Sequence, residues 1–257
     1  MDMKIIMVIG LVLVGSIAFA QTEDQAELGI ELDATWASKY IWRGFDLYDD
    51  KAAFQPSVDL DLFGTGFSVN VWGSTGCAEQ LVNGDELDYS VTYQNSMFND
   101  TKFQTDYSVS WVYYDYVRLN SGAVDAQEFN MSLSWPEICS FGVVPTYTIA
   151  YLYPSKPDSA AARLGLDGFV HVLGLTYDYV IPDTELPLTF CWDITYNDGQ
   201  GGTSVEHDWS HMTWGLSTGF DVGPGTFTPS VYYQTSMEDS VNTEDELWTT
   251  LSYTFGF

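Results

Sequence analysis

Positive charge is scarce in this sequence. Lysine and arginine together number 8, against 36 aspartates and glutamates, and the formal net charge is −28. A protein that binds nucleic acid needs a basic surface to neutralise phosphates, so this composition argues against a nucleic-acid partner. Aromatic residues make up 16% of the chain. That content argues against acidic disorder, because disordered segments are poor in aromatic residues.

Cysteine is also rare. The chain contains Cys77, Cys139 and Cys191, an odd number that permits at most one disulfide and leaves one thiol over. Their spacing does not resemble the closely spaced ligand pairs of zinc sites. We therefore expect no functional cysteine, no metal centre and no cofactor.

Long apolar runs are missing after the first residues. Residues 1–20 contain Lys4, an apolar core from Ile5 to Ile17 and the small-x-small pattern of Ala18 to Ala20. This arrangement predicts a secretory signal peptide and a mature chain of 257 − 20 = 237 residues. No later stretch approaches the roughly 18 uncharged apolar residues of a spanning helix. If the mature chain enters a membrane, it does so as a closed barrel, because only helices and barrels satisfy every backbone group in lipid.

What the sequence has instead is short segments in which apolar and polar residues alternate. In one of them Val58 and Leu60 share one side, and Asp59 and Asp61 share the other. Twelve such segments follow one another, the first expected over residues 28–42 and the last over residues 246–257. A period of two predicts β-strands, so we expect an all-β protein with residues 21–257 as its domain.

The connections between these segments alternate in length. Long connections follow every odd-numbered segment, around residues 43–53, 75–84, 115–125, 154–167, 197–207 and 236–245. Shorter connections follow the even-numbered segments. Long loops at one end and short turns at the other are typical of an outer-membrane barrel with an even number of strands.

Aromatic residues distinguish this barrel from a soluble sandwich or a soluble barrel. They gather near the ends of the segments on the apolar side, at Trp36, Tyr40, Trp42, Tyr93, Tyr113, Trp135, Tyr153, Phe169, Tyr179 and Tyr196. A bilayer interface selects aromatic residues at both ends of an apolar band. We predict an antiparallel transmembrane β-barrel of about 12 strands in a Gram-negative outer membrane, with the last strand closing against the first.

Residues 38–74 carry a resemblance to a known family. The stretch resembles the TorF-type porins in its S-x-Y-x-x-R-G motif, an acidic residue followed by lysine, a strand of alternating acids and a final W-G-S. The matching positions are Ser38, Tyr40, Arg43, Gly44, Asp50, Lys51, Asp59, Gly66, Phe67, Trp72, Gly73 and Ser74. The acidic loop of residues 236–246 has no counterpart in that pattern. The resemblance implies an outer-membrane porin, and Phe257 is similar to the terminal aromatic read by the barrel assembly machinery.

Acidic residues dominate the polar side of the predicted strands. We expect the pore lining to include Glu31, Asp33, Asp59, Asp61, Asp88, Asp106, Asp178, Asp193 and Asp221, with Arg43 and Lys39 as the inward basic residues. Rings of carboxylates favour cations in a water-filled pore. The role of these acids stays open, because they can either select cations or simply keep the lumen hydrated. The role of Arg43 also stays open, because it can either anchor a loop through an ion pair or stand at a constriction.

These patterns predict a porin-like barrel for passive diffusion of small cationic or neutral solutes, with outer-membrane lipid around it. Twelve strands lie between the barrels of about 8 strands that side chains fill and the barrels of 16–18 strands that leave a wide channel. We therefore expect a narrow lumen. Inward Trp72, Tyr232 and Trp248 either fill it or stack on a solute.

Two other functions are weighed against the porin. One is a plugged structural or ligand-binding barrel without conductance. The other is a barrel-embedded hydrolase, for which residues 215–219 match G-x-S-x-G. That motif needs a turn into a helix and a later histidine, whereas His171, His207 and His211 all precede Ser217. We expect no enzyme. The acids of the last loop, Glu238, Asp239, Glu244, Asp245 and Glu246, either hold a divalent cation or are simply solvated.

Overall fold

The structure is a computed structural model that describes residues 27–77, 85–117, 124–182, 184 and 186–257. The predicted signal peptide, residues 1–20, lies outside the described residues. In the described part of the chain, no helix has the length and apolar character to cross a bilayer.

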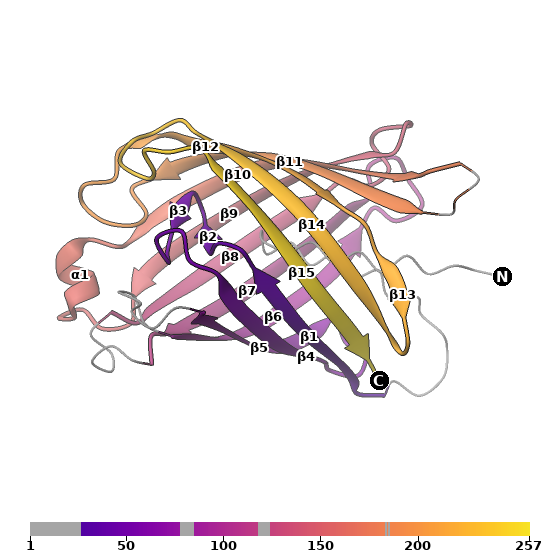
Figure 1. Ribbon diagram of the computed structural model, residues 1–257, viewed down its shortest axis with the longest axis horizontal. Helices are drawn as coiled ribbons and strands as arrows, with labels where there is room; N and C mark the ends of the chain where they lie inside the picture. The colour runs from indigo at the N-terminus through magenta and orange to yellow at the C-terminus, as the bar shows by residue number, and fades with distance from the viewer. Residues whose placement is uncertain (1–26, 78–84, 118–123, 183, 185) are drawn as a thin grey trace.

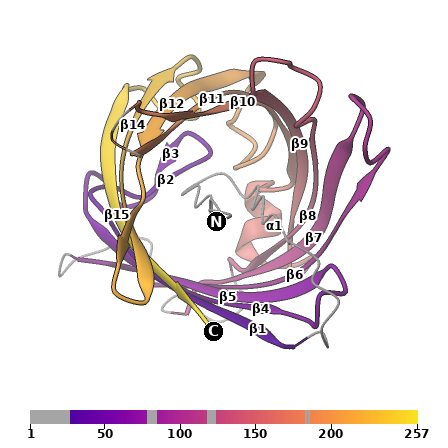
Figure 2. The same ribbon diagram turned by 90° about the vertical axis from the view of Figure 1, so that its right-hand side faces the viewer.

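Twelve long antiparallel strands form a closed wall. They are β1 (Gly29–Ala37), β4 (Ala53–Asp61), β5 (Phe67–Gly76), β6 (Glu86–Met97), β7 (Thr105–Asp115), β8 (Ala126–Ser134), β9 (Val143–Pro154), β10 (Gly168–Val180), β11 (Pro187–Asp198), β12 (His207–Ser217), β14 (Gly225–Ser236) and β15 (Glu246–Gly256). The first and last strands, β1 and β15, pair with each other, and β12 pairs with β14, so the sheet closes into a ring (Figure 2). Short β13 (Phe220–Val222) pairs with the start of β14. The predicted barrel is confirmed, and closure gives each of the twelve strands a paired neighbour on both sides.

The connections sort to the two ends of the barrel as predicted. The long ones gather at one end, on the left in Figure 1, where the connection from β9 to β10 contains the short helix α1 (Ala160–Leu164). The shorter ones gather at the opposite end, near the C-terminus (Figure 1). We call these the long-loop end and the short-turn end.

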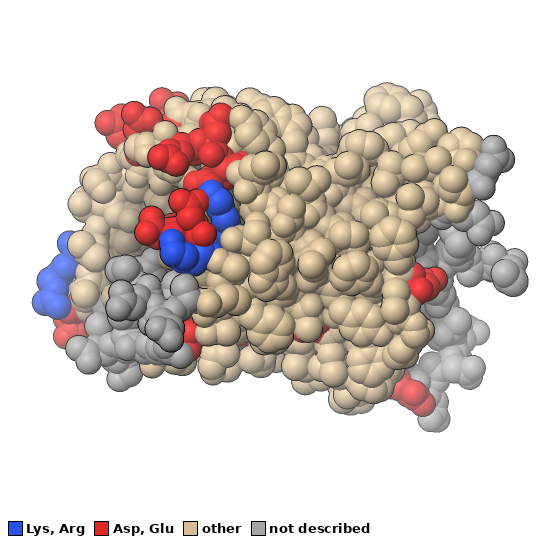
Figure 3. Space-filling model, viewed as in Figure 1, with Lys and Arg blue, Asp and Glu red and all other residues tan. Residues whose placement is uncertain are grey.

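Each strand presents an apolar outer side and a polar inner side. On β8, Glu128, Asn130 and Ser132 are buried, whereas Phe129 and Met131 between them are exposed. On the face shown in Figure 3, charged side chains gather toward the two ends and the wall between them is largely uncharged. A soluble sandwich buries its apolar side, so this reversed pattern is that of a transmembrane barrel.

Two members of the predicted aromatic girdle lie inside the barrel instead. The prediction of one strand over residues 28–42 is wrong, because β1 ends at Ala37. Beyond it, the Ser38 hydroxyl accepts the Thr249 N–H at 2.9 Å and so ends the backbone ladder with β15. The chain then turns inward, which buries Tyr40 and places Trp42 against the inner wall.

The inward segment is a small hairpin of β2 (Ile41–Trp42) and β3 (Phe45–Asp46), joined by Arg43 and Gly44. Both turn residues have positive φ, 49° at Arg43 and 93° at Gly44. This is the type I′ geometry that matches the twist of paired strands. We call residues 38–52 the lumenal hairpin.

The chain end lies at the seam between β1 and β15. The Phe257 N–H donates to the Ile30 carbonyl at 2.9 Å, while the Phe257 side chain is 72% exposed. The backbone of the last residue therefore extends the seam, and recognition of its side chain by the assembly machinery stays a prediction.

Candidate functional site

The lumenal hairpin crosses the barrel at the long-loop end (Figures 1 and 2). Its tip is held from several sides. Arg43 forms an ion pair with Glu128 of β8, and its guanidinium donates to Gln200 at 2.9 Å. The Gly44 carbonyl accepts from Gln234 of β14 and from Asn242, both at 3.1 Å. The hairpin is thus a strut between opposite walls.

The Arg43–Glu128 pair is buried and well supplied with hydrogen bonds. Glu128 is 0% exposed, and it also accepts from Tyr114 at 3.2 Å and from Gln200 at 3.3 Å. Burial opposes the positive charge of Arg43, but the facing Glu128 carboxylate outweighs it, and the pKa of Arg43 lies above its usual value. This ion pair is the contact that the anchor role predicts, and a constriction role for Arg43 stays a prediction.

The base of the hairpin is held by a second ion pair. Lys39 contacts Asp50 and lies 2.6 Å from Glu246 of β15. Burial lowers the pKa of Lys39, but hydrogen bonds to these two carboxylates raise it by more, so the net shift of the pKa is upward. The hydrogen bond from Lys39 also lowers the pKa of the Asp50 carboxyl. Carboxylate oxygens of Asp46, Asp50 and Glu246 lie within 4.8 Å of one another, and the Lys39 ammonium explains two of the three.

Other acids of the last loop serve its own fold. Asp245 accepts from the Tyr233 hydroxyl at 2.7 Å and from the Ser236 N–H at 2.9 Å. Glu238 accepts from the Ser240 N–H at 2.9 Å. These bonds favour a structural role over the divalent-cation site considered from the sequence.

Aromatic and aliphatic side chains pack the hairpin into the lumen. Tyr40 contacts Trp72 with ring centroids 5.7 Å apart, and Trp42 contacts Tyr114 at 5.9 Å. Ile41 packs against Tyr232 and Trp248, whose rings stack at 5.2 Å. The inward aromatic residues identified in the sequence therefore narrow the long-loop half of the barrel.

Most of the predicted lining acids lie in the short-turn half. Glu31 stands directly opposite Asp59 across β1 and β4, and Asp61 is opposite Gly29. Asp33 accepts hydrogen bonds from Thr35, Ser252 and Thr254. The remaining acids near this end are Asp106, which accepts from Ser96 at 2.6 Å, Asp178, which accepts from Thr189 at 2.7 Å, and Asp221, which is exposed in β13. Their role in lining a conducting pore stays a prediction.

Asp88 and Asp193 differ from the other acids. Each is half-buried and has one carboxylate oxygen, Oδ1, that is shielded from solvent and has no hydrogen-bond partner among the described residues. Asp88 lies in β6 near the long-loop end, and Asp193 lies in the middle of β11.

Sequence reasoning missed two buried acids, Glu86 and Glu128. Each occupies an inward position at the long-loop end of its strand, one residue outside the segment assigned from the sequence. Glu86 accepts from the Tyr40 hydroxyl at 3.0 Å. Extending the alternation by one residue would have found both.

Neither Ser217 nor Ser210 has the surroundings that a hydrolase nucleophile needs. Ser217 is the last residue of β12, and the next element along the chain is strand β13 rather than a helix. Ser210 and His211 do touch, with Oγ and Nδ1 2.8 Å apart, because a β-bulge turns both side chains inward. Ser210 is 0% exposed and also donates to the Thr195 carbonyl at 3.2 Å. This hydroxyl is sealed from any substrate.

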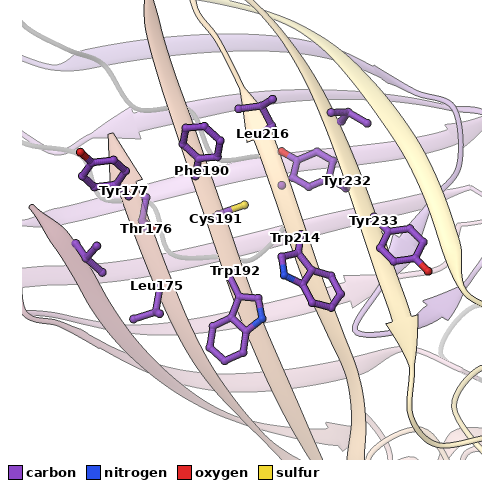
Figure 4. Close-up of a pocket in the computed structure, with 13 residues that line it drawn as sticks. Leu175, Thr176, Tyr177, Phe190, Cys191, Trp192, Trp214, Leu216, Tyr232 and Tyr233 are labelled. Atoms are coloured by element: carbon purple, nitrogen blue, oxygen red, sulfur yellow. The ribbon is translucent and has the colours of Figure 1, made fainter. Parts of the chain in front are cut away.

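An apolar hollow of about 490 Å³ lies on the wall over β10 to β14 (Figure 4). Outward side chains such as Trp192, Trp214 and Leu216 line it. In a transmembrane barrel this surface faces acyl chains, so the hollow belongs to the lipid-facing band rather than to the lumen.

The fold is similar to that of solved porin structures. The KdgM porin matches with a TM-score of 0.54 and 9% identity over 88% of this chain and 99% of that one. The NanC porin matches with a TM-score of 0.51 and 10% identity over 88% of this chain and 98% of that one. Identity this low shows a shared fold alone.

Comparison of sequences places the chain in a family. No curated protein matches it, and the finer assignment to the TorF-type porins stays a prediction. The matching family model is described as a bacterial protein of unknown function (Gcw_chp) and covers residues 23–255. The chain belongs to the Gcw_chp family.

Proposed function

We propose that the protein is an outer-membrane channel that passes small cationic or neutral solutes by passive diffusion. The observation that carries the proposal is the charge of the inner face. Glu31, Asp59 and Asp61 gather on neighbouring strands at the short-turn end, whereas the inward basic residues Arg43 and Lys39 are both neutralised in ion pairs. Unpaired carboxylates in a narrow aqueous pore attract cations and repel anions.

The surroundings of the barrel support the same proposal. Its outer side is apolar, as contact with outer-membrane lipid requires, and the KdgM and NanC structures of similar fold are named porins. A passive channel needs no cofactor and no catalytic residue. We also propose that the assembly machinery inserts the barrel by reading β15 and Phe257.

A plugged structural or ligand-binding barrel is the second candidate. The packing of the lumenal hairpin favours it, because Tyr40, Ile41 and Tyr48 are each less than 5% exposed inside the barrel. In this case the long loops, rather than the lumen, carry the function.

Single-channel recording in a planar bilayer separates the two candidates. We expect discrete conductance steps and a reversal potential that indicates cation preference in a salt gradient. Asp59→Asn combined with Asp61→Asn lowers that preference. Asp100→Asn is the matched control, because Asp100 is an exposed acid in a turn at the same end. A folded, heat-modifiable barrel that gives no steps rules out the channel and supports the plugged barrel.

A further inference from the structure

A pair of acids lies beneath the lumenal hairpin, on the inner side of β6. Glu86 and Asp88 are two residues apart in the strand, so both side chains point into the lumen. Glu86 is 4% exposed, and Asp88 is half-buried. Two carboxylates this close, in a place with little water, repel each other unless something compensates their charge.

Their compensation within the described residues is incomplete. Glu86 accepts hydrogen bonds from the Tyr40 and Tyr116 hydroxyls, whereas Asp88 Oδ1 is shielded from solvent and has no hydrogen-bond partner among the described residues. The neighbouring guanidinium of Arg43 is already engaged by Glu128. Ion pairs among the described residues include neither Glu86 nor Asp88. Burying a carboxylate oxygen without a hydrogen-bond donor costs free energy, and Asp88 Oδ1 has no such donor among the described residues.

Aromatic rings surround the two acids. Asp88 stands directly opposite Trp72 of β5 and directly opposite Tyr114 of β7. The hairpin adds Tyr40, whose ring lies 5.7 Å from that of Trp72, and Trp42, whose ring lies 5.9 Å from that of Tyr114. The two acids therefore lie among aromatic rings that β5, β7 and the lumenal hairpin contribute.

This combination fits one kind of ligand better than others. Aromatic faces attract organic cations, and an ammonium group supplies three donors for oxygens that lack them. Calcium and magnesium instead require six or more oxygen ligands or waters, which aromatic walls do not supply. We propose that Glu86 and Asp88, with Trp72, Tyr114 and Tyr40, bind the ammonium group of an organic solute. The proposal deepens the channel proposal, because it names a solute class for the same lumen.

Isothermal titration of the folded barrel in detergent tests this site. The probe is n-butylammonium chloride, with sodium chloride and magnesium chloride as separate arms. We expect saturable binding of butylammonium alone, and at least a tenfold weaker affinity in Asp88→Asn and in Glu86→Gln. Glu206→Gln is the matched control, because Glu206 is an exposed acid at the same end of the barrel and does not belong to the predicted lining. Its affinity should equal that of the wild type.

Three results would overturn the proposal. One is the absence of saturable heat with butylammonium in the wild type. Another is equal affinity in the wild type and in whichever of Asp88→Asn and Glu86→Gln reaches the heat-modifiable folded form. Saturable magnesium binding that disappears in the same variants also overturns it, by showing an inorganic cation site. Binding needs no conductance, so a barrel that binds without conducting refutes the channel alone, and one that conducts without binding refutes the site alone.

Discussion

At the level of single residues, Arg43 and Gly44 determine how the lumenal hairpin turns. A Cβ on Gly44 would lie 2.6 Å from His211 Nδ1 and 2.8 Å from Val241 Cγ1, and the φ of 93° also favours glycine. Arg43 has a φ of 49°, which is uncommon for a residue with a side chain. Its side chain forms the buried ion pair with Glu128, so the two requirements together give a physical reason for the R-G pair of the sequence motif.

Glu128→Gln tests the ion pair. The change leaves the Arg43 guanidinium in the lumen without its carboxylate, and removing one partner of a buried pair costs about 3–5 kcal/mol. We expect the hairpin to leave its position, so that trypsin cleaves after Arg43 in the detergent-solubilised barrel, whereas the ion-paired Arg43 of the wild type resists cleavage. Mass spectrometry of the fragments locates the cut. Glu206→Gln, an exposed acid at the same end, should behave like the wild type, and equal resistance of Glu128→Gln would show that the pair does not hold the hairpin.

At the level of elements, the wall was predictable and the hairpin was not. A strand in a barrel wall reveals itself through local alternation, and the parity of residues such as Asp59 and Leu60 fixed both the strand and its two sides. Tyr40 and Trp42 continue the same alternation, so the sequence pattern extends β1 through residues that in fact fold inward. What redirects them is long-range, namely the bond between Ser38 and Thr249 and the ion pair across the lumen. No local period carries that information.

The hairpin should release at alkaline pH because of Tyr48. Its hydroxyl donates to Ser74 Oγ at 3.0 Å, and burial raises the pKa of Tyr48 from 10 to about 12. A pKa raised by folding means that the contribution to stability is complete below pH 10 and is lost as the pH rises toward 12. Near-ultraviolet tyrosinate absorbance measures this directly. The difference between wild type and Tyr48→Phe should show one tyrosine that titrates near pH 12. A difference curve centred near the ordinary value would contradict the burial of Tyr48.

At the level of the whole molecule, the two halves of the barrel differ. The long-loop half is filled by the hairpin, and the inward basic residues Lys39 and Arg43 are paired with acids. The short-turn half contains the opposed Glu31 and Asp59 together with Asp61. For a conducting barrel, we therefore expect the hairpin to select solutes by size and the acids of the short-turn half to attract cations over a distance. This division makes the two kinds of selectivity separable by experiment.

Salt concentration provides that separation. The Debye length falls from about 10 Å at 0.1 M salt to about 3 Å at 1 M, so carboxylates on the wall lose their influence on the centre of the lumen. We expect cation preference, measured from reversal potentials, to be strong in dilute salt and weak in concentrated salt. Glu31→Gln combined with Asp59→Asn should reduce the preference in dilute salt and change little in concentrated salt, while Asp100→Asn changes neither. A cation preference that is independent of salt concentration would place the selecting step at the hairpin. There the permeating ions come within contact distance of fixed groups, so dissolved salt does not screen the interaction.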